Sequence, residues 1–482
     1  MQAASHTLVK PLPMSFIAGL RCTVCRSADL DFATDVITCR RCGQECPVLG
    51  GVPVMFDTVS VQDGAAVDEL SARQVLAVFE LQDDPVSVLR IRTMMRKQVR
   101  FGGSLIQVES RQFLDRVRNS GHDIASDAPG GGASHAQAPA DLAIVPRYAW
   151  SKNYVPRRVR AATELLANMR LENRGDVTLS RAGGQSGAGR AMIAQRWQQR
   201  DGTAVATPDL RTPLPIDLHP GQAVTVAVRL MPPARTGSYL LALTLVQEQV
   251  RWLDDDALAM VVSVEHEVPG PVPEGWHVLA KGPDDYDADH RRGRDMLAAW
   301  FAGHPAGSSR TRPRVLEVGG NVYPMCAGMD AELVNVDVDL LGLQVGRMVA
   351  ARRGLTMDLV CADAFNLPFA NGYFDAIVIF ASLHHFPDPA ALLEQLRWKL
   401  RPGGFIGLLC EPVGHIWPGA ILAPFLAELE RGVNEQSFSL REYELMFRQA
   451  DLAPAEVVVD FDSLKARLVH AAPDDASGPD RA

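Results

Sequence analysis

The sequence predicts a multidomain protein whose C-terminal part has an α/β, Rossmann-like fold. Three observations support this prediction. Short apolar runs alternate with helix-length segments after residue 286, apolar and polar residues alternate within 155–268, and four cysteines form two close pairs near the N-terminus. At 482 residues, 47% of them hydrophobic and 22% charged, the composition is that of a globular chain with several domains.

The net charge, the lengths of the apolar runs and the N-terminal residues indicate which classes of protein are not expected. The net charge of -9 and the pI of about 5.8 count against a nucleic-acid-binding surface. No apolar run reaches the roughly 18 residues of a membrane-spanning helix. The N-terminus lacks the charged start and apolar core of a secretion signal. We therefore expect a cytoplasmic protein without a transmembrane segment, and the sequence leaves its oligomeric state open.

Two cysteine pairs predict a metal site. Cys22-x-x-Cys25 and Cys39-x-x-Cys42 each suit a tight turn that presents two thiolates, and two such turns make a tetrahedral sulfur site. In a reducing compartment a metal is favoured over disulfides. Because all four ligands are cysteines, no position is left for a catalytic water, so the zinc would be structural.

The residues around these pairs resemble a known zinc ribbon. The second pair is followed by Cys46-Pro-Val-Leu-Gly-Gly-Val-Pro-Val-Met-Phe56. Residues 15–57 are similar in this respect to the small activator subunit of tRNA methyltransferases, a ribbon that precedes many methyltransferase and polysaccharide-biosynthesis chains. Cys46 stands where that pattern has tyrosine, and we interpret it as a buried residue and not as a ligand.

A helical segment and a linker are expected next. Within residues 66–120, apolar periodicity predicts helices over 68–79, 85–100 and 104–117. Residues 125–141 are rich in Ala, Pro, Gly and Ser, which is typical of a flexible linker.

Residues 155–268 predict a β-sandwich. Alternation over 165–171, 224–230, 239–246 and 259–264, separated by Pro/Gly turns, is typical of short antiparallel strands. The segment resembles the immunoglobulin-like domains of bacterial cell-surface polysaccharide gene products. Trp197 and Trp252 have two interpretations, as platforms that stack on sugars or as buried core residues.

The C-terminal part carries an ordered set of strand-end motifs. Val-Leu-Glu-Val-Gly-Gly at 315–320 ends an apolar run in glycines, which lets the backbone approach a ligand. Acidic residues end the runs 333–337 and 359–363, and an acidic residue at the end of the second strand suits a ribose diol. A strand at 373–380, a helix at 389–400, Arg401-Pro-Gly-Gly404 and a strand at 405–410 follow.

At these residues, and over 286–466, the chain resembles the class I S-adenosylmethionine-dependent methyltransferases. The resemblance implies that Glu317 contacts the ammonium group of the cofactor, that Asp337 accepts the ribose hydroxyls and that Asp363 accepts the adenine amine. The family loop usually ends in glycine where this chain has Asn321, a residue that tolerates positive φ, and Pro324 would then lie near the start of the next helix. The implied cofactor-binding residues are Glu317, Gly319, Gly320, Asn321, Asp337, Asp363, Ala364 and Phe380.

His384 and His385 are the catalytic candidates. They follow the fourth strand, beside the expected methyl group, and a histidine is a suitable base for a hydroxyl acceptor. Histidine at this place also often only orders the loop. Further pocket candidates are Glu411, Pro412, His415 and the run Asn434-Glu435-Gln436.

The functional hypothesis is therefore an S-adenosylmethionine-dependent methyltransferase that O-methylates a sugar or glycoconjugate in bacterial polysaccharide biosynthesis. The acceptor is inferred from the kinds of domain that occur together in this chain, which is an association and not a mechanistic argument. Two alternatives are an rRNA base methyltransferase with a zinc ribbon and a degenerate, non-catalytic fold that binds carbohydrate or acts as a scaffold. A disordered tail is expected at 471–482.

Overall fold

The computed structural model describes residues 18–63, 67–101, 147–153, 155–184, 187–268, 273–279, 286–303, 312–414, 434–460 and 462–471. The expected third helix at 104–117, the linker at 125–141, His415 and nearly all of the expected tail lie outside these residues. Within the described part, no helix is long and apolar enough to cross a membrane.

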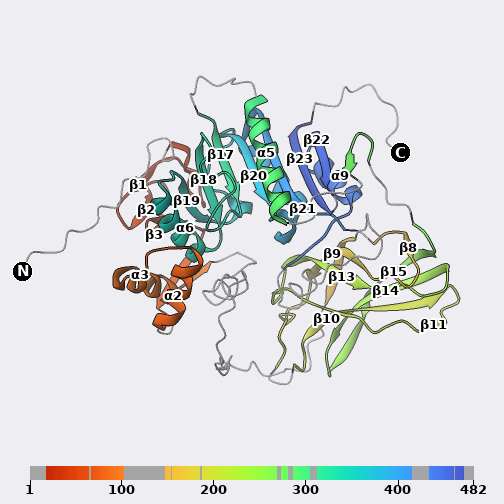
Figure 1. The fold of residues 1–482 in the computed structure, drawn as a ribbon. Helices are drawn as coiled ribbons and strands as arrows, with labels where there is room; N and C mark the ends of the chain where they lie inside the picture. Colours follow the sequence, from red (N-terminus) through yellow and green to blue (C-terminus); the bar gives the residue numbers. More distant parts are fainter. Residues whose placement is uncertain are drawn as a thin grey trace, which may run out of the picture.

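A single 12-stranded sheet organises the larger half of the molecule (Figure 1). Its centre is a parallel ladder in the order β19-β18-β17-β20. These strands are β17 (Arg314–Val318), β18 (Glu332–Asp337), β19 (Asp358–Ala362) and β20 (Phe374–Phe380). Each is a short apolar run that is almost wholly buried, as expected for strands covered on both faces. The predicted α/β core is confirmed.

Four helices line this sheet. Three of them begin at a side-chain cap. Asp339 accepts from the N–H of Gly342, Asp388 accepts from the N–H of Ala391, and Ser439 forms a reciprocal capping box with Glu442. Helix α6 ends at Gly354, which has a left-handed conformation. The helices are α5 (Tyr286–Gly303), α6 (Leu340–Arg353), α7 (Pro389–Lys399) and α9 (Leu440–Gln449), with short 3-10 turns η1 (Ala364–Asn366) and η2 (Leu383–His385).

The helix expected after the glycine turn is absent, and this expectation was wrong. Residues 319–331 form only turns between β17 and β18. Pro324 accepts from the N–H of Ala327, and Cys326 accepts from the N–H of Met329. The segment is too short and too interrupted by Gly and Pro for a regular helix.

The cysteine-rich segment is part of the same sheet, which the sequence did not predict. Its hairpins are β1 (Leu30–Phe32), β2 (Val36–Cys39), β3 (Glu45–Leu49) and β4 (Val52–Met55). Strand β4 pairs in parallel with β19, so the ribbon covers one edge of the central ladder. Cys46 is 3% exposed and lies in the core, as expected.

On the other side the sheet continues through β21 (Leu400–Pro412), β23 (Ser463–His470), β22 (Leu452–Asp460) and β16 (His277–Leu279). Strand β21 begins at Leu400 and includes the Arg401-Pro-Gly-Gly404 run, so the strand predicted from Phe405 starts earlier than expected. Its ladder with β23 shifts register between Leu408 and Glu411.

Two of the three predicted N-terminal helices are confirmed, and a hairpin follows them. Helices α2 (Glu69–Val78) and α3 (Pro85–Arg96) share a buried cluster with α6 through residues such as Leu76, Ile91 and Val345. The second helix ends earlier than expected, because residues 97–101 form β6 (Lys97–Phe101) and pair with β5 (Val59–Asp63).

Residues 148–265 form two further sheets around one core that includes Trp197, Met169 and Leu243. One sheet has the order β11-β10-β14-β15-β8 with β12 on β10, and the other has the order β13-β9-β7. The strands are β7 (Tyr148–Asn153), β8 (Arg158–Arg160), β9 (Leu165–Asn173), β10 (Ala191–Gln199), β11 (Ala204–Val205), β12 (Arg211–Pro213), β13 (Ala223–Leu230), β14 (Gly237–Gln247) and β15 (Arg251–Glu265).

These sheets contact the loop that carries the candidate histidines. Asn168 of β9 is fully buried and donates to the carbonyl of Ser437 (2.9 Å) and to Glu442 Oε1 (3.0 Å). Arg170 donates to the carbonyl of Pro387 (2.9 Å), as does the N–H of Thr225 (3.1 Å). The smaller sheet therefore packs against the ends of η2 and the start of α9.

Replacing Asn168 with alanine should destabilise the protein. The change removes two donors from buried acceptors, which typically costs about 1–3 kcal/mol. Chemical denaturation of Asn168→Ala should therefore show a lower free energy of unfolding than Gln199→Ala, whose side chain is exposed at the end of β10. Equal stabilities of the two variants would mean that the contact does not join the two parts of the molecule.

Glu442 should make stability depend on pH. Burial raises the pKa of this carboxyl from 4.5 to about 7, although Asn168 and Ser439 donate to it. Between these values the folded protein keeps a proton that the unfolded chain releases, so the free energy of unfolding falls as pH rises from 4.5 to about 7. Over this range the free energy of unfolding of the wild type should fall by on the order of 3 kcal/mol relative to that of Glu442→Gln. Chemical denaturation at several pH values measures this difference. Parallel pH profiles would contradict the assignment.

Candidate functional site

The glycine turn after β17 requires an unusual backbone. Gly319 has φ +79°, and a Cβ there would lie 2.8 Å from Ser382 Oγ. Asn321 has φ +41°, so the asparagine that replaces the family glycine does occupy the left-handed region, as expected. At Gly320 a Cβ would lie 2.5 Å from Asn335 Oδ1. The two glycines are therefore required by neighbouring side chains of the protein itself.

Asp337 lies at the end of β18, directly beside this turn. Its Oδ2 accepts from the N–H of Asn321 (3.0 Å) and its Oδ1 from the N–H of Asp339 (2.8 Å). The side chain is half-buried. An ionised carboxylate has about four acceptor positions, which makes it a suitable group for binding a diol.

Glu317 is fully engaged by the protein backbone. It is 1% exposed, and its two oxygens accept from the N–H groups of Met325 (2.6 Å) and Cys326 (2.8 Å). Burial raises the pKa of this carboxyl, against the effect of these donors. Glu317 therefore holds the turns after Pro324 in place, and its contact with a cofactor ammonium remains a prediction.

The third strand end carries Asp363, which caps η1. Its Oδ1 accepts from the N–H of Phe365 (2.9 Å), and burial raises the pKa of the carboxyl. Ala364 is buried behind it. Phe365 meets Phe386 edge-on, with ring centroids 6.0 Å apart, and Phe380 at the end of β20 meets His290 in the same way at 4.7 Å. Aromatic rings thus lie near both the third and the fourth strand ends.

His384 is held by a buried carboxylate. Glu411, at the end of β21, accepts from the N–H groups of Ser382 (2.9 Å), Leu383 (2.9 Å) and His384 (3.2 Å), and its Oε2 lies 2.9 Å from His384 Nδ1. Burial by itself lowers the pKa of His384, but Glu411 and Glu435 outweigh it and raise that pKa to about 9. These two carboxylates therefore favour the protonated form of His384.

His385 and Glu435 complete the cluster. His385 Nδ1 is 3.2 Å from Glu435 Oε2, and His384 Nε2 is 3.4 Å from Glu435 Oε1. Burial favours a raised pKa for Glu435, but the two imidazoles lower it to about 2. Gln436 donates to the carbonyls of His384 (3.0 Å) and Phe386 (2.8 Å), which fixes the loop. The structure thus brings together four of the residues that the sequence singled out separately.

Three positive-φ residues mark the same sheet edge. Besides Asn321, Ala381 has φ +44° after β20 and Cys410 has φ +57° within β21. Backbone in this region costs about 1–3 kcal/mol for a residue other than glycine, and such positions cluster at functional sites. The edge where the strands β17, β20 and β21 end is therefore the strained part of the sheet.

The four cysteines form a compact cluster. Cys22 Sγ is 3.6 Å from Cys42 Sγ, and Cys25 Sγ is 3.6 Å from Cys39 Sγ. Disulfide sulfurs are about 2.05 Å apart, whereas sulfurs around a tetrahedral zinc with bonds of about 2.3 Å are about 3.8 Å apart. The observed spacing fits a zinc ion and excludes disulfides in this arrangement.

Neither predicted sugar-stacking tryptophan offers a free ring. Trp197 is 2% exposed, packs edge-on against Tyr239 and donates to Gln195, so it is a core residue. The guanidinium groups of Arg196 and Arg211 lie 3.8 and 4.4 Å from the ring centroid of Trp252. The sequence pattern could not show these arginines, because they lie on other strands.

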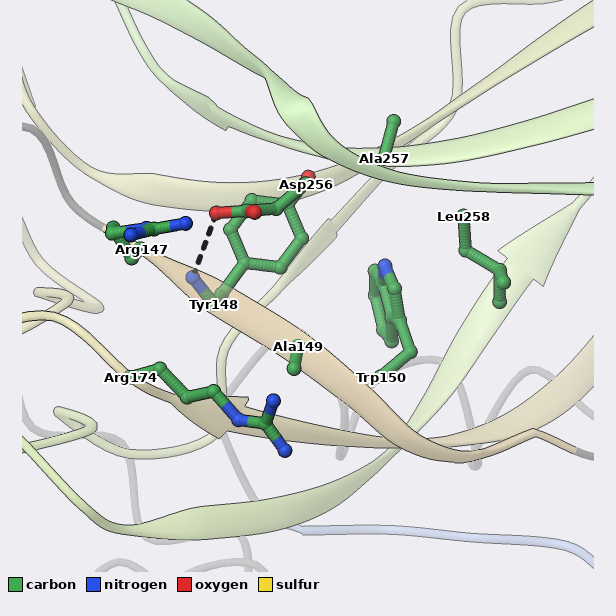
Figure 2. A pocket seen from close by; sticks show the side chains of 8 residues that line it. All are labelled: Arg147, Tyr148, Ala149, Trp150, Arg174, Asp256, Ala257 and Leu258. Atoms are coloured by element: carbon green, nitrogen blue, oxygen red, sulfur yellow. Dashed lines mark hydrogen bonds between the residues drawn. The ribbon is translucent and has the colours of Figure 1, made fainter.

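A hollow of about 540 Å³ lies in the sandwich and not at the strained sheet edge (Figure 2). Trp150 stands beside Leu258 in its wall, and Asp256 accepts from the N–H of Tyr148 (3.2 Å). Sequence analysis missed this feature, because Trp150 lies in a short strand without a clear apolar alternation.

Residues 316–408 match a family model described as a methyltransferase domain. The ubiquinone/menaquinone biosynthesis C-methyltransferase UbiE of Coxiella burnetii is 32% identical over 108 residues, which are 21% of this chain and 43% of that protein. The uncharacterized protein Rv1405c of Mycobacterium tuberculosis is 35% identical over 104 residues, 20% of this chain and 38% of that protein. The chain thus spans less than half the length of these relatives.

Solved structures resemble part of the chain. A putative methyltransferase of Bacillus halodurans is 19% identical and covers 34% of this chain and 71% of its own, with a TM-score of 0.28. A second structure is a complex between the Haloferax volcanii Trm112 methyltransferase activator and the putative methyltransferase. The matched chain is 17% identical, and the match covers 39% of this chain and 97% of that chain, with a TM-score of 0.27. Residues 316–408 thus match a methyltransferase domain, and the strand order, the glycine turn and the acidic strand ends lie within or beside this segment.

Proposed function

We propose that the chain transfers a methyl group from S-adenosylmethionine to an acceptor bound at the carboxyl edge of the central strands. The observation that carries this proposal is the juxtaposition of the Asn321 turn with the carboxylate of Asp337 inside the matched segment. Ligands of open α/β sheets bind outside the carboxyl ends of the strands, where these groups lie.

The residues present fit the cofactor. Asp337 is a carboxylate at the end of β18 and would accept the two ribose hydroxyls, and Asp363, at the end of the neighbouring strand, would accept an adenine amine. Phe365 lies beside Asp363 and supplies an apolar ring face. The bound cofactor would supply an electrophilic methyl group, and the protein would hold the acceptor in line with it. Ala364, Phe380 and the turn from Glu317 to Asn321 would form the rest of this wall.

The acceptor is proposed to be a hydroxyl of a sugar or another small molecule. The cluster of His384, His385 and Glu435 follows β20 and lies one loop away from the glycine turn, since Ser382 Oγ donates to the carbonyl of Val318 (3.1 Å). A hydroxyl must lose its proton during methyl transfer, and this cluster offers the nitrogen and oxygen atoms for that step. His385 is the more exposed imidazole, with 41% of its side chain accessible.

Two other functions remain as alternatives. A base methyltransferase acting on RNA would need a basic surface, which the net charge of -9 does not favour. A non-catalytic carbohydrate-binding fold gains support from the missing helix after Pro324 and from the hollow beside Trp150. Polysaccharide assembly as the setting rests on the sandwich and the ribbon alone.

We further propose that Cys22, Cys25, Cys39 and Cys42 hold a structural zinc ion. The two turns have the same geometry, because the residue after each pair has positive φ and its N–H donates to the carbonyl of the first cysteine of the pair. The ribbon also contacts the loop after β19, residues 363–367, which we call the adenine-side loop. Arg26 donates to the carbonyl of Leu367 in this loop (3.0 Å). Zinc would thereby support the cofactor wall as well as strand β4.

Asp337→Ala should weaken cofactor binding. Losing hydrogen bonds from two hydroxyls to a charged acceptor should cost about 2–3 kcal/mol, or roughly a 30- to 100-fold rise in Kd. Calorimetric titration with S-adenosylmethionine measures this directly. The control is Asp330→Ala, whose carboxylate is exposed in the turns before β18. Equal Kd values for both variants and the wild type would place the cofactor elsewhere.

Cys39→Ala should remove one tightly bound zinc per chain and lower the melting temperature, because the ribbon loses the ion that holds its hairpins. Zinc content after dialysis against a chelator, together with thermal unfolding, measures both effects. Cys46→Ala is the matched control, since this cysteine is buried within the ribbon, on β3, and is not in the cluster. Unchanged zinc content in Cys39→Ala would refute the structural site.

A further inference from the structure

We propose that His384, His385 and Glu435 bind a divalent transition-metal cation on the acceptor side of the site. This inference deepens the proposed function and rests on it, because the cation would act on the acceptor oxygen. It concerns a site separate from the four cysteines.

The ligand atoms have the spacing that a metal requires. One nitrogen of each imidazole and one oxygen of Glu435 lie within 4.8 Å of one another. The separations from Glu435 to His384 Nε2 and His385 Nδ1 are 3.4 and 3.2 Å. Ligands at about 2.0–2.2 Å from an ion are about 3.0–3.5 Å apart in octahedral or tetrahedral geometry. The cluster can therefore admit an ion with small side-chain adjustments.

Glu411 orients His384 for this role. Glu411 Oε2 lies 2.9 Å from His384 Nδ1, within hydrogen-bond distance. The other ring nitrogen of His384, Nε2, therefore faces Glu435. Imidazoles that bind metals almost always donate their other nitrogen to a carboxylate or carbonyl in this way. Glu411 is itself fixed by the three N–H groups of residues 382–384. A ring held so firmly is positioned before any ligand arrives.

His385 Nδ1 is the atom that the protein leaves unsatisfied. It is shielded from solvent and, among the described residues, has no hydrogen-bond partner of acceptable geometry, although Glu435 Oε2 is 3.2 Å away. A buried polar atom without a partner costs about 1–3 kcal/mol. Asn434 and Gln436 donate to the carbonyls of His385 and His384, so the two histidines are fixed through their main chain. A cation between Nδ1 and the carboxylate would satisfy both groups.

The donor set indicates the kind of ion. Two imidazoles and one carboxylate suit Zn²⁺, Co²⁺ or Fe²⁺ better than Mg²⁺ or Ca²⁺, which prefer oxygen ligands, and three protein ligands leave open positions. An acceptor hydroxyl at an open position would release its proton to solvent more readily. Its oxygen would then form the new bond to the methyl carbon, while the electrons of the breaking C–S bond stay on sulfur.

The test uses the full chain with zinc retained in the cysteine site and weakly bound metals removed by chelator. Calorimetric titration with Co²⁺ alone, in parallel with visible absorption, should show one added Co²⁺ per chain with a spectrum that lacks sulfur-to-cobalt charge-transfer bands. His385→Ala and Glu435→Gln should each weaken this binding at least about 10-fold. His470→Ala, an exposed histidine at the end of β23, should leave it unchanged.

The outcomes separate this proposal from the proposed function. No Co²⁺ binding beyond the cysteine site, or binding that neither variant weakens, would overturn the metal site and leave an imidazolium–carboxylate cluster. S-adenosylmethionine titrations of the same samples report independently on cofactor binding, so absent cofactor binding with intact Co²⁺ binding would refute only the proposed function. Unfolding curves of the two variants confirm that any loss is not a loss of fold.

Discussion

The parallel register of β17, β18, β19 and β20 is the constraint on which the rest of the structure depends. Parallel strands end at one edge, so the residues that follow them meet there regardless of their distance along the chain. Asn321, Asp337, Asp363 and the histidine loop all come together for this reason. The same edge carries the positive-φ residues at Ala381 and Cys410, which are strained conformations held by the rigid ladder.

Both sides of this ladder are covered by the protein's own additional strands. The ribbon pairs β4 with β19, while β21 and the antiparallel β22 and β23 extend the other side. An unpaired edge strand exposes hydrogen-bonding groups, and the ribbon removes that exposure beside the adenine-side loop. The smaller sheet of the sandwich buries Asn168 against Ser437 and Glu442. These appended parts therefore support the loops of the site, which gives them a physical role whatever the acceptor is.

The sequence predicted the central strands well, because each is a short apolar run that ends in Gly, Asp or Phe. It also predicted the left-handed conformation of Asn321. It could not predict the pairing of β4 with β19, since strand pairing between distant segments leaves no local signal. The missing helix after Pro324 depends on Glu317 accepting backbone N–H groups, and the arginines at Trp252 lie on other strands. The sequence suggested Glu411 only as a pocket residue. Its hydrogen bond with His384 depends on the register shift near the end of β21, which the sequence does not reveal.

Amide hydrogen exchange with and without S-adenosylhomocysteine tests the central claim most directly, because it locates the ligand without requiring the acceptor. We predict slower exchange confined to the backbone of 319–322, 337–340 and 363–366, the three loops that end β17, β18 and β19. The sandwich residues 147–150 around the hollow should exchange at an unchanged rate. Protection at the hollow, or none at the three loops at saturating ligand, would contradict a cofactor site at the strained edge of the sheet.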